Sequence, residues 1–341
     1  MTKPIDRRTF LMAAAGAVAG AAASPASTGA RMQTPAYTLT PDPLGSVLET
    51  ADGRTAFVYM TRKPDDPNFW ANHTCCFHPV FTPAGERLTD FAPGDHHHHR
   101  GIFLSWHSMT FRRRADFTSL GPLGPTHGFD INRGDFWGWG QFAPTDTRVI
   151  VNRGVRLVRA DARSAEVEIL NDWTIGGQTY LGERTTVGWQ EEGGANVLDL
   201  TYRLTPDWDL ALDRAAFGGF CVRARKDGES WYSDPAGRVT KPDPHYSAPE
   251  LNWPAADWYA YAIRIAGGRE IGCAVVNHAS NPPTTWHNPR YVWMVNPTIV
   301  AERAYEVPQG QTLTLRYRVI VFDGALPSAL VGRLSGDWRR N

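Results

Sequence analysis

Apolar and polar residues alternate along much of this chain, and that alternation constrains its fold more than any other feature. The pattern is clear at residues 155–158, 165–170, 196–204 and 313–321. A period of two is typical of β-strands with one buried face and one face in water. Dipeptides suited to hairpin turns separate such runs: Asp52-Gly53, Gly176-Gly177, Gly193-Gly194, Asp227-Gly228, Gly267-Gly268 and Gln309-Gly310. The chain from about residue 36 to residue 323 is therefore expected to be all-β, a large antiparallel β-sandwich of two sheets packed face to face.

The end of the chain has a different pattern. Pro327-Ser328 begins a run in which Leu330, Val331 and Leu334 recur at helical spacing. Proline is common in the first turn of a helix, so a short C-terminal helix is expected there. No repeat or low-complexity linker divides the rest of the sequence. We therefore predict that residues 31–341 form a single domain.

The first thirty residues resemble an export signal. Arg7 and Arg8, followed by Thr-Phe-Leu, precede the apolar stretch 12–23. This stretch is much shorter than the roughly 20 residues that span a bilayer, and small residues that suit a cleavage site follow it. Adjacent arginines in this position are typical of twin-arginine signals, which a receptor reads as an address. We predict that residues 1–30 are a twin-arginine signal peptide and that the mature protein is periplasmic or secreted.

Charge and hydropathy narrow the possible partners. The 35 lysines and arginines balance 35 aspartates and glutamates, and no long basic run is present, so nucleic acid is not an expected partner. No segment approaches about 18 uninterrupted apolar residues, so membrane insertion is not expected either. Cys75, Cys76, Cys221 and Cys273 have no CxxC spacing. They are either buried thiols or, for the adjacent pair, a vicinal disulfide.

Two segments interrupt the alternation and hold most of the histidines. The first comprises residues 78–85, 95–101 and 135–138, and the second covers residues 277–288. Together they contain seven of the eleven histidines. Loops carried by rigid sheets are where binding and catalytic residues concentrate. We therefore expect the functional site to be built from these two segments.

The motifs in and around these segments resemble those of a known family. They are, in order, Pro79…Thr82-Pro83-Ala84-Gly85, Asp95-His96-x-His98-His99-Arg100-Gly101, Asp135-Phe136-Trp137-Gly138, Gly218-Gly219-Phe220, Ala256-Asp257-Trp258, His278-x-x-Asn281-Pro282…Trp286-His287 and Leu315-Arg316-Tyr317-Arg318-Val319…Asp323-Gly324. From about residue 70 to residue 324 the chain resembles the secreted family of unknown function often labelled "methane oxygenase PmoA". The resemblance implies a galactose-mutarotase-like β-sandwich, or supersandwich, and a role in sugar breakdown.

The sequence departs from that family between Arg100 and Asp135. An insertion containing Arg112-Arg113-Arg114 and Thr126-His127-Gly128 stands there in place of a shorter link. We expect this insertion to alter substrate preference. The three arginines form a solvated turn, or they attract an acidic sugar such as a uronate.

Imidazoles beside a guanidinium indicate proton-transfer chemistry. His98 or His99 is a candidate general acid or base, and Arg100 is a candidate clamp for a carboxylate or a developing oxyanion. Asp135 or Asp257 would supply a second proton-transfer group. The candidate catalytic residues are His98, His99, Arg100, Asp135, His278 and His287. We expect these six side chains to converge on one concave site.

A metal ion is the competing explanation of the same histidines. If residues 96–100 are extended, His96 and His98 lie on one face and both can reach one divalent transition metal. The third ligand would come from elsewhere in the fold, with these candidates: His78, His107, His127, His278 and His287. The cofactor therefore stays open between no metal and a divalent ion held by His96 and His98. A further alternative gives these histidines only a solvated or structural role.

The sequence contains 13 tryptophans, more than a core alone requires. Flat aromatic faces beside hydrogen-bonding groups suit the two sides of a sugar ring. Trp137 and Trp286 are therefore expected to stack on a sugar. Asn281, Asp257 and His78 are the other expected substrate contacts.

Motifs of several other enzyme classes are absent from the sequence. It contains no GxSxG elbow, no GxxxxGK[ST] loop and no HExxH helix, so serine esterases, P-loop enzymes and zincins are not supported. The predicted function is an exported carbohydrate-active enzyme that cleaves or modifies a glycoside, as a hydrolase or a lyase. The alternative is a non-catalytic carbohydrate-binding or structural β-sandwich protein.

Overall fold

Each of the four alternating sequence runs lies within a strand of the computed structural model, which describes the backbone of residues 36–117 and 126–340. The strands are β8 (Arg148–Ala160), β9 (Ser164–Ile175), β11 (Ala195–Pro206) and β22 (Leu313–Asp323). Along β9 every second side chain from Ala165 to Trp173 is buried. The period-two pattern therefore separates a core face from a solvent face, as expected. The signal peptide predicted at residues 1–30 lies outside the described residues.

These four strands belong to a nine-stranded antiparallel sheet in the order β15-β14-β16-β17-β22-β11-β10-β9-β8. The remaining members are β10 (Gln178–Glu192), β14 (Glu229–Asp234), β15 (Gly237–Arg238), β16 (Trp258–Arg264) and β17 (Glu270–Asn277). Hairpins join neighbours through the expected glycine turns, such as Gly176-Gly177 between β9 and β10. Positive φ at both glycines explains why glycine is favoured in that turn.

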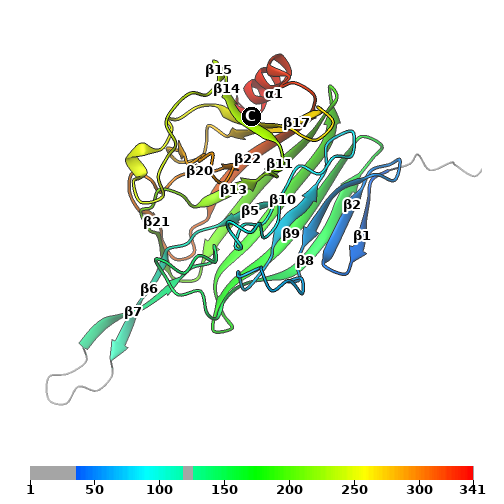
Figure 1. The fold of residues 1–341 in the computed structure, drawn as a ribbon. Helices are drawn as coiled ribbons and strands as arrows, with labels where there is room; N and C mark the ends of the chain where they lie inside the picture. The colour runs from blue at the N-terminus through cyan, green and yellow to red at the C-terminus, as the bar shows by residue number, and fades with distance from the viewer. Residues whose placement is uncertain (1–35, 118–125, 341) are drawn as a thin grey trace, which may run out of the picture. The chain divides into compact units, whose positions relative to one another are not determined.

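A seven-stranded antiparallel sheet faces it (Figure 1), in the order β1-β2-β3-β4-β5-β13-β19. Its strands are β1 (Thr38–Asp42), β2 (Gly45–Glu49), β3 (Thr55–Met60), β4 (Cys76–Val80), β5 (Ile102–Ser105), β13 (Gly219–Arg223) and β19 (Met294–Val295). The strands β5 and β13 matter for the site, because β5 follows directly after residues 95–101 and Arg223 ends β13.

Two smaller sheets complete the described strands. One has the order β21-β12-β6-β7, and the other pairs β18 with β20. Their strands are β6 (Met109–Phe117), β7 (Thr126–Gly134), β12 (Asp209–Leu212), β18 (Thr285–Trp286), β20 (Pro297–Thr298) and β21 (Tyr305–Val307). The insertion noted in the sequence is the β6–β7 hairpin, which projects beyond the strands that it pairs with (Figure 1).

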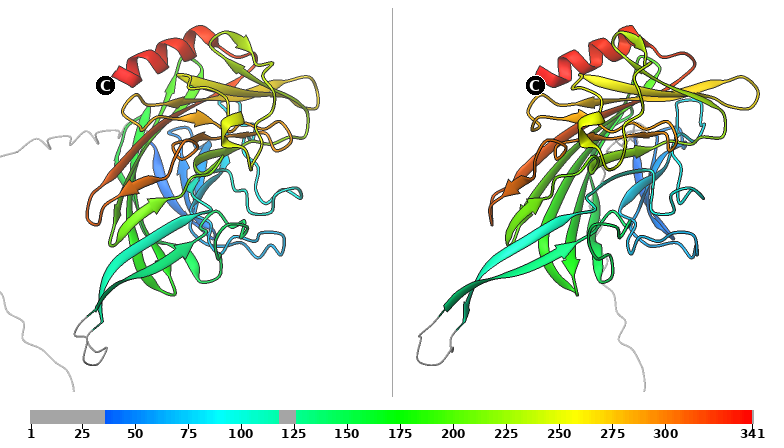
Figure 2. Two further views of the ribbon diagram at one scale, coloured as in Figure 1. Left: turned by 90° about the vertical axis from the view of Figure 1, so that its left-hand side faces the viewer. Right: turned by 60° about the vertical axis from the view of Figure 1, so that its left-hand side comes forward.

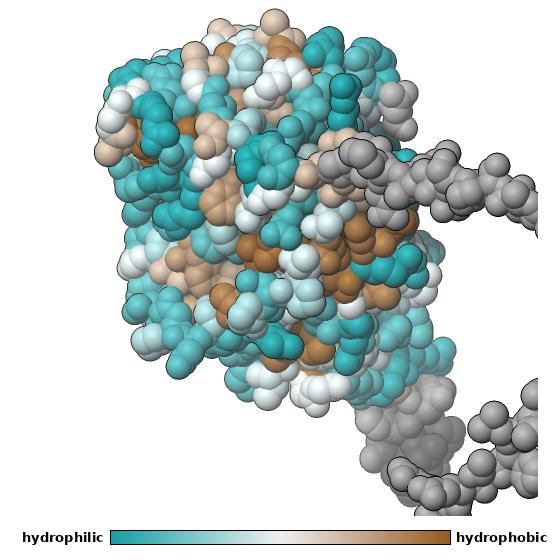
Figure 3. All heavy atoms as spheres, turned by 90° about the vertical axis from the view of Figure 1, so that its right-hand side faces the viewer, coloured by the Kyte–Doolittle hydropathy of each residue, from teal (hydrophilic) through white to brown (hydrophobic). Residues whose placement is uncertain are grey.

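The main core lies between the two larger sheets (Figure 2). Phe57 of β3 packs edge-on against Phe77 of β4, with ring centroids 5.1 Å apart, and meets Trp189 of β10 at 5.6 Å. Burial of one large apolar side chain contributes about 1.5–3 kcal/mol, so contacts repeated between the sheets hold them together. The face on the side of β1 and β2 mixes hydrophilic side chains with hydrophobic patches (Figure 3).

The C-terminal helix α1 (Ser328–Arg340) packs on the outer face of the nine-stranded sheet. Its Val331, Leu334 and Trp338 are buried against residues of β11, β16, β17 and β22. A single turn of 3-10 helix, η2 (Pro249–Leu251), lies in the segment that follows β15. The predicted all-β antiparallel sandwich with a short C-terminal helix is therefore confirmed.

The structure also bears on the predictions about membrane insertion and about the cysteines. Among the described residues, no helix combines the length and the apolar character needed to cross a bilayer. All four cysteines lie in the described part of the chain and are buried free thiols. Of the two alternatives for Cys75 and Cys76, the structure therefore has the buried thiols.

Candidate functional site

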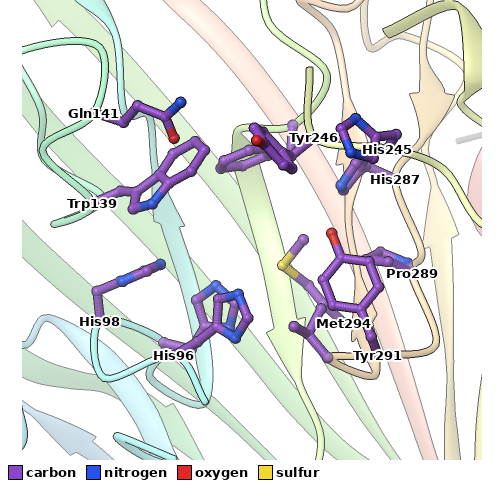
Figure 4. A pocket seen from close by; sticks show the side chains of 13 residues that line it. His96, His98, Trp139, Gln141, His245, Tyr246, His287, Pro289, Tyr291 and Met294 are labelled. Carbon is purple, nitrogen blue, oxygen red and sulfur yellow. The ribbon is translucent and has the colours of Figure 1, made fainter. Parts of the chain in front are cut away.

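A cavity of about 430 Å³ is lined by loops that connect the strands, together with Met294 of β19. We name it the histidine cavity. Figure 4 shows its labelled side chains, with Trp139 and Gln141 on one side, His96 and His98 beside them, and His245 and His287 opposite. Its complete lining is His96, His98, His99, Trp139, Gln141, Phe217, His245, Tyr246, His287, Pro289, Tyr291, Val292 and Met294. Five imidazoles and several aromatic rings thus face one space of the size that small-molecule ligands occupy.

The histidine turn, residues 95–99, brings three of these imidazoles together. Its backbone is not extended: the amide of His96 donates to the carbonyl of Pro93, and the amide of His99 donates to that of His96. The expected alternation of faces is therefore wrong, because successive turns, not a strand, set the side-chain directions. His97 packs against Trp70 instead, with ring centroids 4.8 Å apart.

The tautomer of His99 is set by a buried arginine. Arg223, at the end of β13, has no exposed surface, and its Nη1 donates to Nδ1 of His99 at 3.4 Å. A guanidinium only donates, so Nδ1 must accept and the neutral ring carries its proton on Nε2. His99 therefore presents an N–H donor to the cavity.

His96 and His287 have the opposite arrangement. Nδ1–H of His96 donates to Oδ2 of Asp95 at 3.1 Å, and Nδ1–H of His287 donates to Oδ1 of Asn252 at 2.9 Å. In each ring Nε2 then carries the lone pair and can accept a proton. His96 also stacks on His99, with ring centroids 4.7 Å apart and planes 18° from parallel. A donor ring and two acceptor rings thus line the same cavity.

Burial keeps these imidazoles neutral. It lowers the pKa of His98 and of His287 to about 3. It also lowers the pKa of His96 and places that of His99 well below the ordinary value. Neighbouring cations, among them Arg223 and Arg100, act in the same direction on His98 and His99. Near pH 7 the rings therefore donate and accept as neutral groups.

Aromatic side chains surround the cavity. The rings of Trp139 and Tyr246 meet at a centroid distance of 5.5 Å and an angle of 88°. Tyr246 is 39% exposed and Tyr291 is 50% exposed. Large aromatic rings that stay in contact with water beside a cavity are available to stack on a ligand.

Asp135 shapes the turn that presents Trp139. Its carboxylate accepts hydrogen bonds from the amides of Gly138 and Gly140. Gly138 has φ +100°, and a Cβ there would lie 2.9 Å from Cβ of Ala71, so only glycine fits. Burial raises the pKa of Asp135 to about 6. The sequence predicts a catalytic role for Asp135, but the residue is 1% exposed and does not line the cavity.

Arg100 is placed in the interior, not in the cavity. It has no exposed surface, and its guanidinium donates to the carbonyls of Thr74, His98, Phe136 and Trp137 at 2.9–3.1 Å. These bonds tie the main chain of the histidine turn, at His98, to the main chain at Thr74, Phe136 and Trp137. The expectation that Arg100 clamps a substrate group is therefore wrong, because its donors are already occupied.

Trp137 and Trp286 also lie in the interior. Neither side chain has any exposed surface. Trp137 packs against Phe103 and Phe217, and Trp286 packs against Tyr259. Neither ring can stack on a sugar, which corrects that expectation. Trp139, two residues after Trp137, lines the cavity instead.

His278, Asp257 and Asn281 lie around a second cavity of about 220 Å³, which also includes Arg339. His278 bonds Ser280 Oγ through Nδ1 (2.7 Å) and accepts from Arg316 through Nε2 (2.8 Å). Asp257 forms an ion pair with Arg339 of α1. These contacts hold α1 and β22 in place. The six candidate catalytic residues therefore do not converge: His98, His99 and His287 line the histidine cavity, and His278 does not.

Asn281 and His78 have structural partners too. Asn281 Nδ2 donates to the carbonyl of Arg316, and its Oδ1 accepts from the Arg316 amide, both at 2.8 Å. His78 bonds Thr89 Oγ1 at 2.9 Å, and burial lowers its pKa to about 3. Neither residue lines the histidine cavity.

The metal alternative finds no support in the geometry of the described residues. Within them, no group of three or more His, Cys, Asp or Glu side chains is arranged to hold a metal ion. Arg223 donates to Nδ1 of His99, so that nitrogen is occupied and a positive charge already stands beside the rings. The side chain of His127 lies outside the described residues.

Sequence reasoning missed five residues of the site: Gln141, Arg223, His245, Tyr246 and Tyr291. Four of them lie in loops without regular alternation, and Arg223 lies at the end of a buried strand. The sequence offered an indication only for Tyr291, which follows the second histidine-rich segment by three residues. The three arginines of the insertion lie on the β6 strand, where they are exposed and outside the lining of the cavity.

Comparisons with solved structures give low similarity. An α-galactosidase of family GH36 from Geobacillus stearothermophilus aligns at 8% identity and TM-score 0.35, over 84% of this chain and 40% of that chain. An α-galactosidase from Lactobacillus brevis aligns at 10% identity and TM-score 0.33, over 85% of this chain and 38% of that chain. A galactose mutarotase related enzyme from Lactobacillus acidophilus aligns at 8% identity and TM-score 0.32, over 84% of this chain and 97% of that chain. Alignments at this level support no conclusion about activity.

Comparisons of sequence show the family. No curated protein matches the chain. None of the three solved structures above carries the "methane oxygenase PmoA" label, so that resemblance stays a prediction. The model of a family of unknown function, DUF6807, matches residues 46–335. This match covers most of the sequence and nearly all of the described β-sandwich, and the chain belongs to the DUF6807 family.

Proposed function

We propose that the chain is a carbohydrate-active enzyme that transfers protons on a sugar or glycoside bound in the histidine cavity. The observation that carries this proposal is the fixed set of tautomers. Nε2–H of His99 is a donor backed by Arg223, while Nε2 of His96 is an acceptor backed by Asp95. A base oriented by a carboxylate and a donor oriented by a cation are the two parts that general acid–base catalysis requires.

The aromatic residues of the cavity supply the binding surface. Trp139 and the partly exposed rings of Tyr246 and Tyr291 offer flat faces for the apolar side of a sugar ring. Gln141 and the neutral imidazoles offer hydrogen bonds to its hydroxyl groups. Such a combination orients the sugar ring against the stacked pair of His96 and His99.

Of the two reaction types that the sequence predicts, elimination suits this lining better than hydrolysis. Most glycoside hydrolases use two carboxylates beside the bond that breaks, and no Asp or Glu is among the described residues that line the cavity. In an elimination, Nε2 of His96 takes a proton from carbon and the neighbouring C–O bond breaks. The imidazolium formed at His96 then returns this proton to the leaving oxygen, while Nε2–H of His99 stabilises, by a hydrogen bond, the negative charge that develops on the sugar. One imidazole therefore accounts for both proton transfers, and the other stays neutral.

We also propose that the enzyme acts outside the cytoplasm, as the twin-arginine pattern at residues 1–30 predicts. Cell fractionation tests this proposal. A shortened product in the periplasm or the medium is expected. A full-length product in the cytoplasm would contradict export without affecting the proposed chemistry.

Turnover tests the chemistry. The mature protein is incubated with a panel of mono- and oligosaccharides, including uronate-containing ones, and the products are followed by NMR. We expect a new product that His96→Gln loses by about 10²–10⁴-fold in rate. His97→Gln is the matched control, because His97 is the next residue along the chain and does not line the cavity. Binding without turnover of any sugar would favour the non-catalytic carbohydrate-binding alternative, and equal loss in both variants would contradict the assigned role of His96.

A further inference from the structure

Two buried arginines place positive charge close to the histidine cavity. Arg100 and Arg223 are both wholly buried next to the histidine turn. Arg100 is hydrogen-bonded only to main-chain carbonyls, so no carboxylate is bonded to it. Two guanidinium charges therefore lie within the protein beneath the imidazoles, where water screens them little.

One carboxylate compensates only part of this charge. Asp95 accepts two bonds from Nη2 of Arg223, at 3.0 and 3.1 Å, and lies 3.1 Å from Nζ of Lys226. Asp95 is therefore shared between two cations. Asp135 is a second acid near the histidine turn, and its oxygens are directed to the amides of Gly138 and Gly140. Asp90 also lies nearby but is paired with Arg87, so that pair adds no net charge. Arg100, Arg223 and Lys226 exceed Asp95 and Asp135 by one positive charge.

The cavity itself adds no negative charge. Its described lining contains five imidazoles and one amide but no carboxylate. In addition, the buried Nε–H of Arg223 has no hydrogen-bond acceptor among the described residues. A ligand in this cavity therefore contacts imidazole and amide groups, and the nearby cations outnumber the nearby carboxylates.

We infer that the ligand of the histidine cavity is an anionic sugar, whose carboxylate or other oxyanion is held on the imidazole side of the cavity. A negative group is the ligand charge that the two buried arginines and the partly exposed Lys226 together stabilise. Nε2–H of His99 donates to it, and the cation of Arg223 stands directly behind that ring. The inference rests on the proposed function, since it names the substrate class of the same site. A carboxylate also acidifies the neighbouring C–H, which is the proton that an elimination removes.

Calorimetric titration of the mature protein tests the inference with matched sugars. Galacturonate is compared with galactose, and glucuronate with glucose, because each pair differs only at the sixth carbon. At least one acid is expected to bind about tenfold or more tightly than its neutral partner, and the preference should shrink as salt is raised. Glucose 6-phosphate tests whether a phosphate can replace the carboxylate. Binding as tight as that of the sugar acids means that any oxyanion suffices, and weaker binding means that the cavity selects the carboxylate.

Two variants locate the charge. Lys226→Gln removes one cation from the Asp95 cluster at an exposed position and is expected to weaken binding of the acid about threefold. Arg264→Gln is the control, because Arg264 of β16 is paired with Glu229 of β14 and Glu270 of β17 and does not line the cavity. Equal affinity for acid and neutral sugar, or binding of neutral sugars alone, overturns the inference. Neither outcome affects the proposed chemistry, which turnover tests separately. Turnover that is absent while the acid still binds preferentially contradicts the proposed function and leaves this inference standing.

Discussion

Nη1 of Arg223 lies 3.4 Å from Nδ1 of His99, and the same guanidinium is joined to Asp95, which accepts the Nδ1–H of His96. One ion pair thus orients two stacked imidazoles in opposite senses. Its cation makes His99 a donor toward the cavity, and its carboxylate makes His96 an acceptor. The two rings differ in function because their partners differ.

The assigned tautomers can be observed directly. Two-dimensional ¹⁵N NMR of the imidazole side chains near pH 7 should show His99 protonated at Nε2 and His96 protonated at Nδ1. The Arg223→Met variant should lose the preference at His99, because Nδ1 then has no fixed donor. A His99 ring protonated at Nδ1 in the unmodified protein would contradict the assignment.

Trp139 is expected to bind sugar, unlike Trp286. Trp139→Ala should weaken binding of a sugar ligand by roughly 1 kcal/mol or more, because a stacking face is lost, with little change in melting temperature. Trp286→Ala should instead destabilise the fold by ~3–5 kcal/mol, since Trp286 is wholly buried. Calorimetry and thermal unfolding of both variants separate these effects, and the opposite pattern would restore the original expectation for Trp286.

Arg100→Ala should unfold or strongly destabilise the protein. Four main-chain carbonyls lose their donor, and each buried group left without a partner costs about 1–3 kcal/mol. Thermal unfolding measures the loss. An Arg100→Ala protein with unchanged melting temperature and no turnover would return Arg100 to the catalytic residues.

Stability should fall as the pH drops below about 6.5, the ordinary pKa of histidine. Burial lowers the folded-state pKa of eight histidines: His73, His78, His96, His98, His99, His107, His278 and His287. Between the unfolded pKa and the lower folded pKa of each ring, the unfolded chain binds protons that the folded chain does not, so acid favours unfolding. Asp135 and Glu183, whose pKa values burial raises, act in the opposite direction but are fewer.

The measurement is denaturant unfolding at several pH values from 7.5 down to 4.5. The free energy of unfolding should decrease steadily over that range, and the slope should correspond to net uptake of several protons. A free energy that stays constant from pH 7.5 to 5 would mean that these rings are charged or exposed in the folded protein. Replacing His107 by Phe should reduce the slope by about one proton.

The fold could be predicted from the sequence because its signal is local. Alternation along 196–204 and 313–321 marks strands, and each strand needs only its own residues to show it. Which strands become neighbours depends on distant contacts that no local pattern carries. β11 lies beside β22, more than one hundred residues later.

The site was only partly predictable, for the same reason. The cluster of histidines at 96–99 marked the correct turn, and His287 lies across the cavity from it. Residue type alone could not separate Trp137 from Trp139, since a turn held by Asp135 directs one inward and the other to the cavity. Arg100 and Arg223 show the same difficulty: both are buried, and only the tertiary partners show that Arg223 acts on an imidazole.

Histidine-selective ¹⁵N NMR during titration with galacturonate tests most directly whether the histidine cavity is the functional site. The side-chain signals of His96, His98, His99 and His287 are predicted to shift together, with saturation at one site. His78 and His278, which lie outside the cavity lining, serve as internal references and should not move. Shifts confined to His278 and its neighbours, or unmoved cavity histidines under conditions where a sugar is turned over, would contradict the account.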